Sequence, residues 1–273
     1  MKPLILIDTS YTSFYRFFAT IRWYSLAHYE EYQKYKLDNQ YDWSKNEIFI
    51  NKYEKMFLES IIKLVKKKIF VNSNIIFCMD TPKEKLWRMK IQNNYKSGRC
   101  DLSLKHNYKT TFDYTYNLMI PKFIEQNKNI NKLRMDKVEA DDIIASICLH
   151  HKEDDQQIYL VSGDDDFLQL GRENLIFINY KKKKPFTLTV EEAKQALMKK
   201  IIYGDPSDCI PGIFPKGKRI NKKMIEDDLN NFLETNDESK KQYEKNVLMI
   251  DFNNIPTKYF NKIIKLYNLI PIL

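Results

Sequence analysis

The chain has 273 residues, a formal net charge of +9 and 43% hydrophobic residues. That hydrophobic content is enough for the buried core of one large or two small domains, which excludes an intrinsically disordered chain. No apolar run approaches the roughly 20 residues that cross a bilayer, and the N-terminus lacks a signal-peptide layout, so we expect an intracellular protein that is neither secreted nor membrane-spanning.

Three apolar runs end abruptly at a carboxylate. PLILI ends at Asp8, NIIFCM at Asp80 and QIYLVSG at Asp164, and NLIFINY at 174–180 is a fourth run of the same kind. Continuous rather than alternating hydrophobicity predicts parallel strands that are buried on both faces. Ligands of such sheets bind outside the carboxyl ends of the strands, so the three acids are predicted to share one edge.

The segments between these strands are predicted to be mainly helical. After Tyr11 comes a long aromatic and charged stretch, whose later part, residues 50–68, has helical periodicity. A basic stretch with interleaved aromatic residues follows Asp80, and a second helical run lies near 114–125. Beyond about residue 185 the chain is predicted to be helical and rich in lysine.

The sequence EADD, residues 139–142, gathers three carboxylates before an apolar helical run. Acids in the first helical turn satisfy free N–H groups and complement the helix dipole, which is a sufficient structural explanation for this stretch alone. Glu139 and Asp142 share one face at i, i+3, whereas Asp141 points elsewhere. Spacing does not decide which of the three contacts a metal ion.

Further acids follow the later strands and open the helical region. SGDDDFLQL supplies Asp164 and Asp166, and GDPSD supplies Asp205 and Asp208. With Asp8, Asp80 and the EADD acids, nine carboxylates are predicted to converge, and unpaired they would repel one another and raise their pKa values. Mg²⁺ or Mn²⁺ would resolve this repulsion, because both prefer oxygen ligands.

Lysine and arginine gather in separate runs, at 66–68, 83–99, 181–184 and 216–223. Each run alone is explained by a solvated surface, but four of them beside a carboxylate site favour a path for a phosphate backbone. Two metal ions can activate water for phosphodiester hydrolysis without a nucleophilic side chain. The four cysteines are scattered and are expected to be reduced thiols, and His150 and His151 are expected to be surface residues.

Six motifs, in this order, resemble the 5′-nuclease (flap endonuclease) superfamily: LILIDTS, FCMD, WRMKIQNNYKSGR, VEADDIIA, VSGDDDFLQL and GDPSDCIPGI. The C-terminal YEKNVLMIDFNNIPTKYFNKIIKLYN is most similar to the ribonuclease H branch of the T-even phages. The resemblance implies an α/β fold with a PIN-like (resolvase-like) parallel sheet flanked by helices. It also implies a catalytic domain at 1–185, with an arch at about 81–125, and a helical DNA-binding region at 186–273 that contains a helix–turn–helix and a C-terminal packing segment.

The resemblance also implies roles for individual residues. Asp8, Asp80, Glu139, Asp141 and Asp164 match the first metal cluster of the family, with Asp142 as an outer ligand, and Asp166, Asp205 and Asp208 match the second. Lys96, Arg99 and Arg88 match the basic arch that steadies the scissile phosphate, so they are the predicted catalytic cations. The predicted nucleic-acid contacts are Lys83, Lys90, Lys216, Lys218 and Arg219. Asp165 is expected to face outward, and Asp251 is expected to be structural.

The activity implied is Mg²⁺-dependent 5′ to 3′ exonuclease and flap endonuclease cleavage by a monomer, with two ions and with Mn²⁺ as a substitute. Expected partners are DNA with 5′ flaps or nicks, RNA–DNA hybrids, and a single-strand-binding protein or polymerase, in the cytoplasm or wherever DNA replication occurs. The chain departs from the family at Cys209, where Asn is usual, and in the turn of the helix–turn–helix, which has one glycine. The family binds a monovalent cation at this turn, and these departures put that cation site in doubt here. The segment after Tyr11 is also longer.

Two alternatives stay open at this stage. A non-catalytic, structure-specific DNA-binding relative would keep the fold as a scaffold, but such proteins should lack several of the acids that this chain retains. A nuclease for DNA junctions or structured RNA would share both fold and acids, because specificity lies in the site and its entrance.

Overall fold

A computed structural model describes residues 1–97, 107–182, 184–214 and 228–271. Its centre is a parallel five-stranded sheet of strand order β3-β2-β1-β4-β5. The strands are β1 (Leu4–Asp8), β2 (Asn74–Met79), β3 (Ile130–Arg134), β4 (Ile158–Val161) and β5 (Leu175–Ile178). Four of the five lie where the apolar runs predicted them, and β3 was not predicted.

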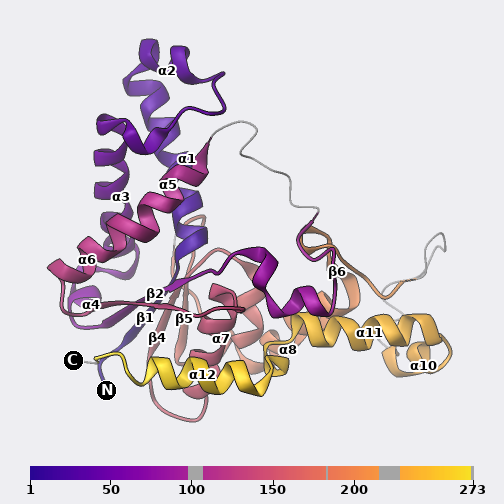
Figure 1. Ribbon diagram of the computed structural model, residues 1–273. Coiled ribbons are helices and arrows are strands. Elements are labelled where there is room, and N and C mark those ends of the chain that lie inside the picture. Colours follow the sequence, from indigo (N-terminus) through magenta and orange to yellow (C-terminus); the bar gives the residue numbers. More distant parts are fainter. Residues whose placement is uncertain (98–106, 183, 215–227, 272–273) are drawn as a thin grey trace.

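Helices cover both faces of this sheet (Figure 1). On one face lie α1 (Thr9–Ala27), α3 (Glu47–Val65) and α6 (Ile120–Gln126), packed on Ile5 and Ile7 of β1. On the other face lie α7 (Ala140–His150) and α12 (Thr257–Tyr267), packed on Leu4 and Leu6 of the same strand. Burial from both sides explains why the sequence of β1 is apolar at every position before Asp8.

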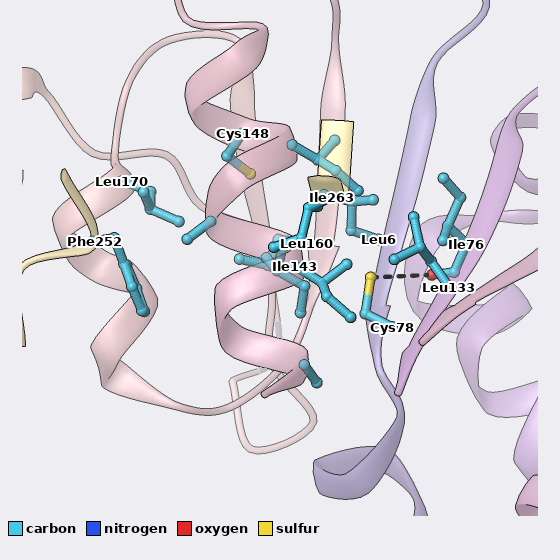
Figure 2. Packing of buried hydrophobic residues seen from close by; sticks show 14 of the residues in the cluster. Leu6, Ile76, Cys78, Leu133, Ile143, Cys148, Leu160, Leu170, Phe252 and Ile263 are labelled. Carbon is cyan, nitrogen blue, oxygen red and sulfur yellow. Dashed lines mark hydrogen bonds between the residues drawn. The ribbon is translucent and has the colours of Figure 1, made fainter. Parts of the chain in front are cut away.

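Figure 2 shows the second of these layers, in which Leu6, Ile76 and Leu160 of three strands meet Ile143 of α7 and Ile263 of α12. The C-terminal segment therefore returns to the core of the sheet domain. The division into a catalytic domain and a helical region with a C-terminal packing segment stays a prediction.

The remaining helices link and extend these layers. α2 (Tyr29–Tyr35) and α4 (Lys67–Val71) are short, and α5 (Tyr108–Tyr114) continues through a π turn (Thr115–Met119) into α6. The C-terminal region contains α8 (Val190–Tyr203), a two-residue ladder of β6 (Gly204–Asp205) and β7 (Ile210–Pro211), α10 (Leu229–Glu234) and α11 (Asp237–Ile250). Short 3-10 turns span Trp43–Lys45, Lys83–Lys85, Trp87–Lys90, Asp165–Leu170, Pro206–Asp208 and Phe252–Asn254.

Side-chain caps set several helix starts next to the sheet edge. Asp8 ends β1, and its Oδ1 accepts a hydrogen bond from the N–H of Tyr11. This cap lets α1 begin directly after the strand. The turn after β4 requires Gly163, because a Cβ there would overlap the phenol of Tyr11. The chain leaves β1 in one direction for β2 and returns to β4 on its other side, so the carboxyl end of β1 is the topological switch point.

Candidate active site

The three predicted strand-end acids lie at one edge of the sheet. Asp8 is the last residue of β1, Asp80 follows β2 and Asp164 follows β4. Ser162 links two of them, because its hydroxyl donates to Asp8 Oδ2 at 2.8 Å and accepts from the N–H of Asp164 at 3.1 Å. The strand ends therefore bring these acids together as the sequence predicted.

Asp80 is held by three neighbours that sequence reasoning missed. Its Oδ1 accepts from the N–H of Ala140 at 2.7 Å, and its Oδ2 accepts a short hydrogen bond from Ser10. The Ser10 hydroxyl is 2.8 Å from the phenol oxygen of Tyr116, which also lies 3.4 Å from the N–H of Asp80. Tyr116 comes from the π turn, a distortion that often occurs at functional sites.

The EADD acids divide between two roles. Asp142 is completely buried, and its Oδ2 accepts from the Glu139 N–H and from the Trp87 indole, both at 3.0 Å. Asp141 instead lines a small cavity together with Asp166, Asp205 and Asp208. The predicted sharing of a face by Glu139 and Asp142 is confirmed, and the structural capping explanation holds for Asp142.

Arg88 lines the same small cavity as Asp141 and Asp208, but its side chain is held by buried acceptors. Its side chain is 4% exposed, and its Nη1 is 3.0 Å from Glu139 Oε2 and 2.8 Å from Asp142 Oδ1. Its Nε donates to the carbonyl of Met249 at 3.0 Å. In the structure the guanidinium therefore pairs with acids of the site, and its predicted contact with the scissile phosphate stays a prediction.

Two lysines reach into the carboxylate cluster. Lys96, one of the predicted catalytic cations, forms a short ion pair with Glu139 and lies 3.8 Å from Asp208. Lys200, on α8, forms a short ion pair with Asp166 and lies 3.0 Å from Asp205. Sequence reasoning missed Lys200; the available signal was its place on a helix five residues before Asp205.

Burial and mutual repulsion perturb the acids of the site. Burial, with the charge on Asp80, raises the pKa of Asp8 to about 7. Burial also raises the pKa of Asp141 well above its usual range. For Glu139 burial acts in the same direction, but Lys96 and Arg88 outweigh it and lower the pKa. Asp205 likewise has a lowered pKa, because Ser207 and Lys200 outweigh its burial.

These carboxylates have the right chemistry to bind divalent ions, but their side chains are not yet spaced around an ion. In the part of the chain that the structure describes, no three His, Cys, Asp or Glu side chains are arranged to hold an ion as they stand. Lys96 and Lys200 occupy positions between the acids, where ammonium groups supply the positive charge. The raised pKa values of Asp8 and Asp141 show that this compensation is incomplete. An all-oxygen, acid-rich donor set is what Mg²⁺ and Mn²⁺ prefer.

The other predicted cations are placed only in part. Lys83 is half-buried and Lys90 is exposed, both on the short turns that follow Asp80. Arg99, Lys216, Lys218 and Arg219, with the turn that concerns the monovalent cation, lie outside the described residues. Their predicted roles stay predictions.

Three further expectations can be compared with the structure. Asp165 is exposed, as predicted. Asp251 accepts from the N–H and the amide of Asn253, both at 2.8 Å, which agrees with a structural role. The expectation that His151 is a surface residue is wrong: it is 8% exposed, and its ring bonds Asp154 and Tyr267, which ties α7 to α12.

A parallel sheet with clustered acids at the carboxyl ends of its strands, flanked by basic segments, defines a PIN-like nuclease domain. A family model described as "5'-3' exonuclease, N-terminal resolvase-like domain" matches residues 3–200. The chain belongs to this family.

Two curated relatives extend the comparison. The 5'-3' exonuclease of Mycoplasmopsis pulmonis is 29% identical over 216 residues, which are 76% of this chain and 64% of that protein. Ribonuclease H of Enterobacteria phage T4 is 26% identical over 251 residues, 82% of this chain and 79% of that protein. The chain thus spans a little under two thirds of the first relative.

Solved structures show the same fold across almost the whole chain. The T5 5'-exonuclease with divalent zinc ions bound has a TM-score of 0.63 at 14% identity, covering 98% of this chain and 99% of that one. The T5 flap endonuclease in a complex with DNA and metal ions has a TM-score of 0.60 at 16% identity, with 98% of each chain covered.

None of the described helices is long and apolar enough to cross a membrane.

Proposed function

We propose that this chain is a divalent-metal-dependent 5′ to 3′ exonuclease and flap endonuclease that hydrolyses phosphodiester bonds in DNA and RNA–DNA hybrids. The observation that carries the proposal is the convergence of strand-end and helix-borne acids with two lysines at one edge of the sheet. Its biological role would be the removal of RNA primers and 5′ flaps during replication or repair. Family membership and the T4 and T5 relatives support this proposal.

The proposed ion ligands are Asp8, Asp80, Glu139, Asp141 and Asp164 for one ion and Asp166, Asp205 and Asp208 for a second, Mg²⁺ or Mn²⁺ serving for each. Ions held there would lower the pKa of an attacking water and stabilise the leaving oxygen. We assign Asp142 a supporting role, because its described contacts run to Trp87, Arg88 and the Glu139 backbone.

The chain's own residues perform the remaining tasks. Ser10, Ser162 and Ala140 orient the carboxylates of Asp8 and Asp80 through the hydrogen bonds described above. Lys96 and Lys200 place ammonium groups at the cluster, where they can stabilise charge that develops on a phosphate.

Residues 1–185 would form the catalytic domain, with the arch at about 81–125, and residues 186–273 would bind the duplex through a helix–turn–helix. In this proposal Lys83 and Lys90 contact substrate near the cut, and Lys216, Lys218 and Arg219 contact duplex backbone. A single-strand-binding protein or a polymerase is the kind of partner that such an enzyme would meet at a replication fork.

The deciding experiment is cleavage of 5′-labelled flap, nicked, blunt and RNA–DNA hybrid substrates in Mg²⁺, with EDTA as the control. Mg²⁺-dependent release of 5′ products is expected. Tight flap binding by folded protein without cleavage in Mg²⁺ or Mn²⁺ would instead establish the non-catalytic DNA-binding alternative. Cleavage confined to junctions or structured RNA would keep the enzyme and change its substrate.

A paired set of variants separates the two basic regions. Lys96→Ala with Arg99→Ala should slow the single-turnover rate at saturating enzyme by roughly a hundredfold, the scale of a lost transition-state charge contact. The Lys216, Lys218 and Arg219 triple alanine should raise the dissociation constant and spare that rate, because contacts to ground-state phosphate are screened. The opposite pattern would show that the two regions have exchanged roles.

A further inference from the structure

We propose that Arg16 and Lys52 form a separate binding site for one phosphate group, in the crevice between helices α1 and α3. These helices pack against each other on the face of the sheet opposite α7 and α12. The site consists of described residues of this chain alone. Only the suggestion that the phosphate belongs to a nucleic acid rests on the proposed function.

Arg16 is a buried cation without an acidic partner among the described residues. It is 8% exposed, it forms no ion pair there, and its Nε is buried without a hydrogen-bond acceptor. Its guanidinium lies 4.6 Å from the ring centroid of Tyr15 and 5.1 Å from that of Tyr180. Arg88, which is equally buried, has two carboxylate partners.

Burying Arg16 without an acidic partner among the described residues has an energetic cost that Arg88 avoids. A buried charge is costly unless it is paired, and stacking on aromatic rings compensates only part of that cost. Aromatic faces also leave the N–H groups of a guanidinium without acceptors in their own plane. Arg16 is therefore equipped for an anion that comes from outside the described fold.

A cavity of about 140 Å³ lies beside Arg16. Lys52 and Thr20 line it with Arg16, while Ala19, Trp23 and Met56 make the rest of its wall mainly apolar. The Lys52 ammonium lies 4.7 Å from the ring centroid of Trp23. No acidic residue lines the cavity. Helix α1 itself carries two arginines and no Asp or Glu in its 19 residues, so the local charge favours an anion.

The donor set fits a phosphate. A planar guanidinium offers several N–H donors in a fixed fork, and an ammonium adds a compact point charge from another direction. Together they can bind different oxygens of one tetrahedral oxyanion. Ala19 also lines a second hollow, whose lining includes Arg22 and Lys181, so further positive charge lies along α1.

The position suggests two sources for the phosphate. Arg16 lies eight residues after Asp8, which corresponds to about 12 Å of helical rise from the carboxylate edge. A nucleic-acid strand lying across the carboxylate edge could place one of its backbone phosphates beside Arg16. A free phosphate or a nucleoside monophosphate offers the same oxyanion. Flap-DNA binding in EDTA distinguishes these sources from a nucleic-acid backbone.

The primary test is a titration with inorganic phosphate, followed by phosphorus NMR, in EDTA at fixed ionic strength. The wild-type chain should bind one phosphate saturably. Lys52→Ala should weaken this binding about tenfold, the scale of one hydrogen bond to a charged group. Arg16→Gln should abolish it. Lys55→Ala is the matched control, because Lys55 is exposed on the same helix, three residues further on. This variant should bind phosphate like the wild type.

The outcomes that overturn the site are equally definite. Absence of saturable phosphate binding in the folded wild type overturns it, and so does equal affinity in Lys52→Ala and Lys55→Ala. If Arg16→Gln does not fold, this lysine pair still decides the question, because Lys52 is only half-buried and Lys55 is exposed.

Flap-DNA binding in EDTA identifies the source. If the phosphate belongs to the substrate backbone, Lys52→Ala should raise the DNA dissociation constant several-fold, and inorganic phosphate should compete with DNA. If the source is free phosphate, the variant should bind DNA like the wild type while losing phosphate. Neither titration requires cleavage, so an inactive wild type would refute the proposed nuclease function and leave this site standing.

Discussion

Replacing Arg88 by methionine is expected to destabilise the protein rather than to slow cleavage selectively. The guanidinium contacts Glu139 at 3.0 Å, Asp142 at 2.8 Å and the Met249 carbonyl at 3.0 Å. The two carboxylates are 5% and 0% exposed, so solvent cannot replace the lost cation. Breaking a buried pair by removing one partner costs about 3–5 kcal/mol, and we expect a loss of that size in the free energy of unfolding.

A second substitution tests whether the stranded charge causes this loss. Asp142→Asn removes the charge but keeps an oxygen that can accept from the Trp87 indole. The double variant Arg88→Met, Asp142→Asn should recover about 0.5–3 kcal/mol relative to additivity, the range found for contacting residues. Lys96 continues to compensate Glu139 in both variants.

The assay is urea denaturation without metal, together with single-turnover cleavage at a temperature at which each variant is folded. The expected result is a lower urea midpoint and a cleavage rate within a few-fold of the wild type. An unchanged midpoint with a cleavage rate lowered about a hundredfold would refute the assignment, because that is the effect of losing a phosphate-contacting cation.

The remaining predictions concern the acids and their supports. Asp80→Asn should abolish cleavage and leave duplex affinity nearly unchanged in a binding assay, whereas Asp251→Asn should retain cleavage; equal damage from both would contradict the structural role of Asp251. Tyr116→Phe should raise the Mn²⁺ concentration for half-saturation, measured by calorimetry, because the support of Ser10 is lost, and Tyr114→Phe in the same segment, which bonds Glu54, should not. Asp8 has a pKa of about 7 in the folded chain against 3.8 as its ordinary value, so the folded state holds a proton that the unfolded state releases. The free energy of unfolding of the metal-free protein should therefore fall as pH rises from about 4 to about 7, and a rise over that range in urea titrations would show that Asp8 is not the controlling group.

The strands that carry the site were predictable for a physical reason. β1, β2 and β4 are covered on both faces, so each is an almost continuous apolar run, and an acid ends the run or follows it within three residues. β3 lies at the edge of the sheet, and its sequence INKLR buries only Ile130 and Leu133 fully. These two buried residues are three positions apart among polar ones, so no apolar run or alternation marks the strand, and for that reason β3 was missed.

Individual side-chain roles depended on contacts between residues distant in sequence. Whether Asp141 or Asp142 faces the cavity is decided by Trp87 and Arg88, which take Asp142 into the core from a separation of more than fifty residues. Tyr116 contacts Ser10 across a sequence separation of 106 residues. Local spacing contains no information about such partners, so the sequence predicted the gathering of acids but not the division of their roles.

Lys96 and Lys200 explain how so acidic an edge is tolerated without a metal ion. Each ammonium lies between two carboxylates, and at Glu139 this lowers the pKa despite burial. At Asp8 and Asp141 compensation is incomplete, and burial raises both pKa values. These two acids have the most to gain from a divalent ion, which would bring two positive charges to the carboxylates that burial destabilises. An ion bound at Glu139 would also release the Lys96 ammonium, so that in the proposed reaction the cation that stabilises the metal-free fold becomes available to the phosphate being cut.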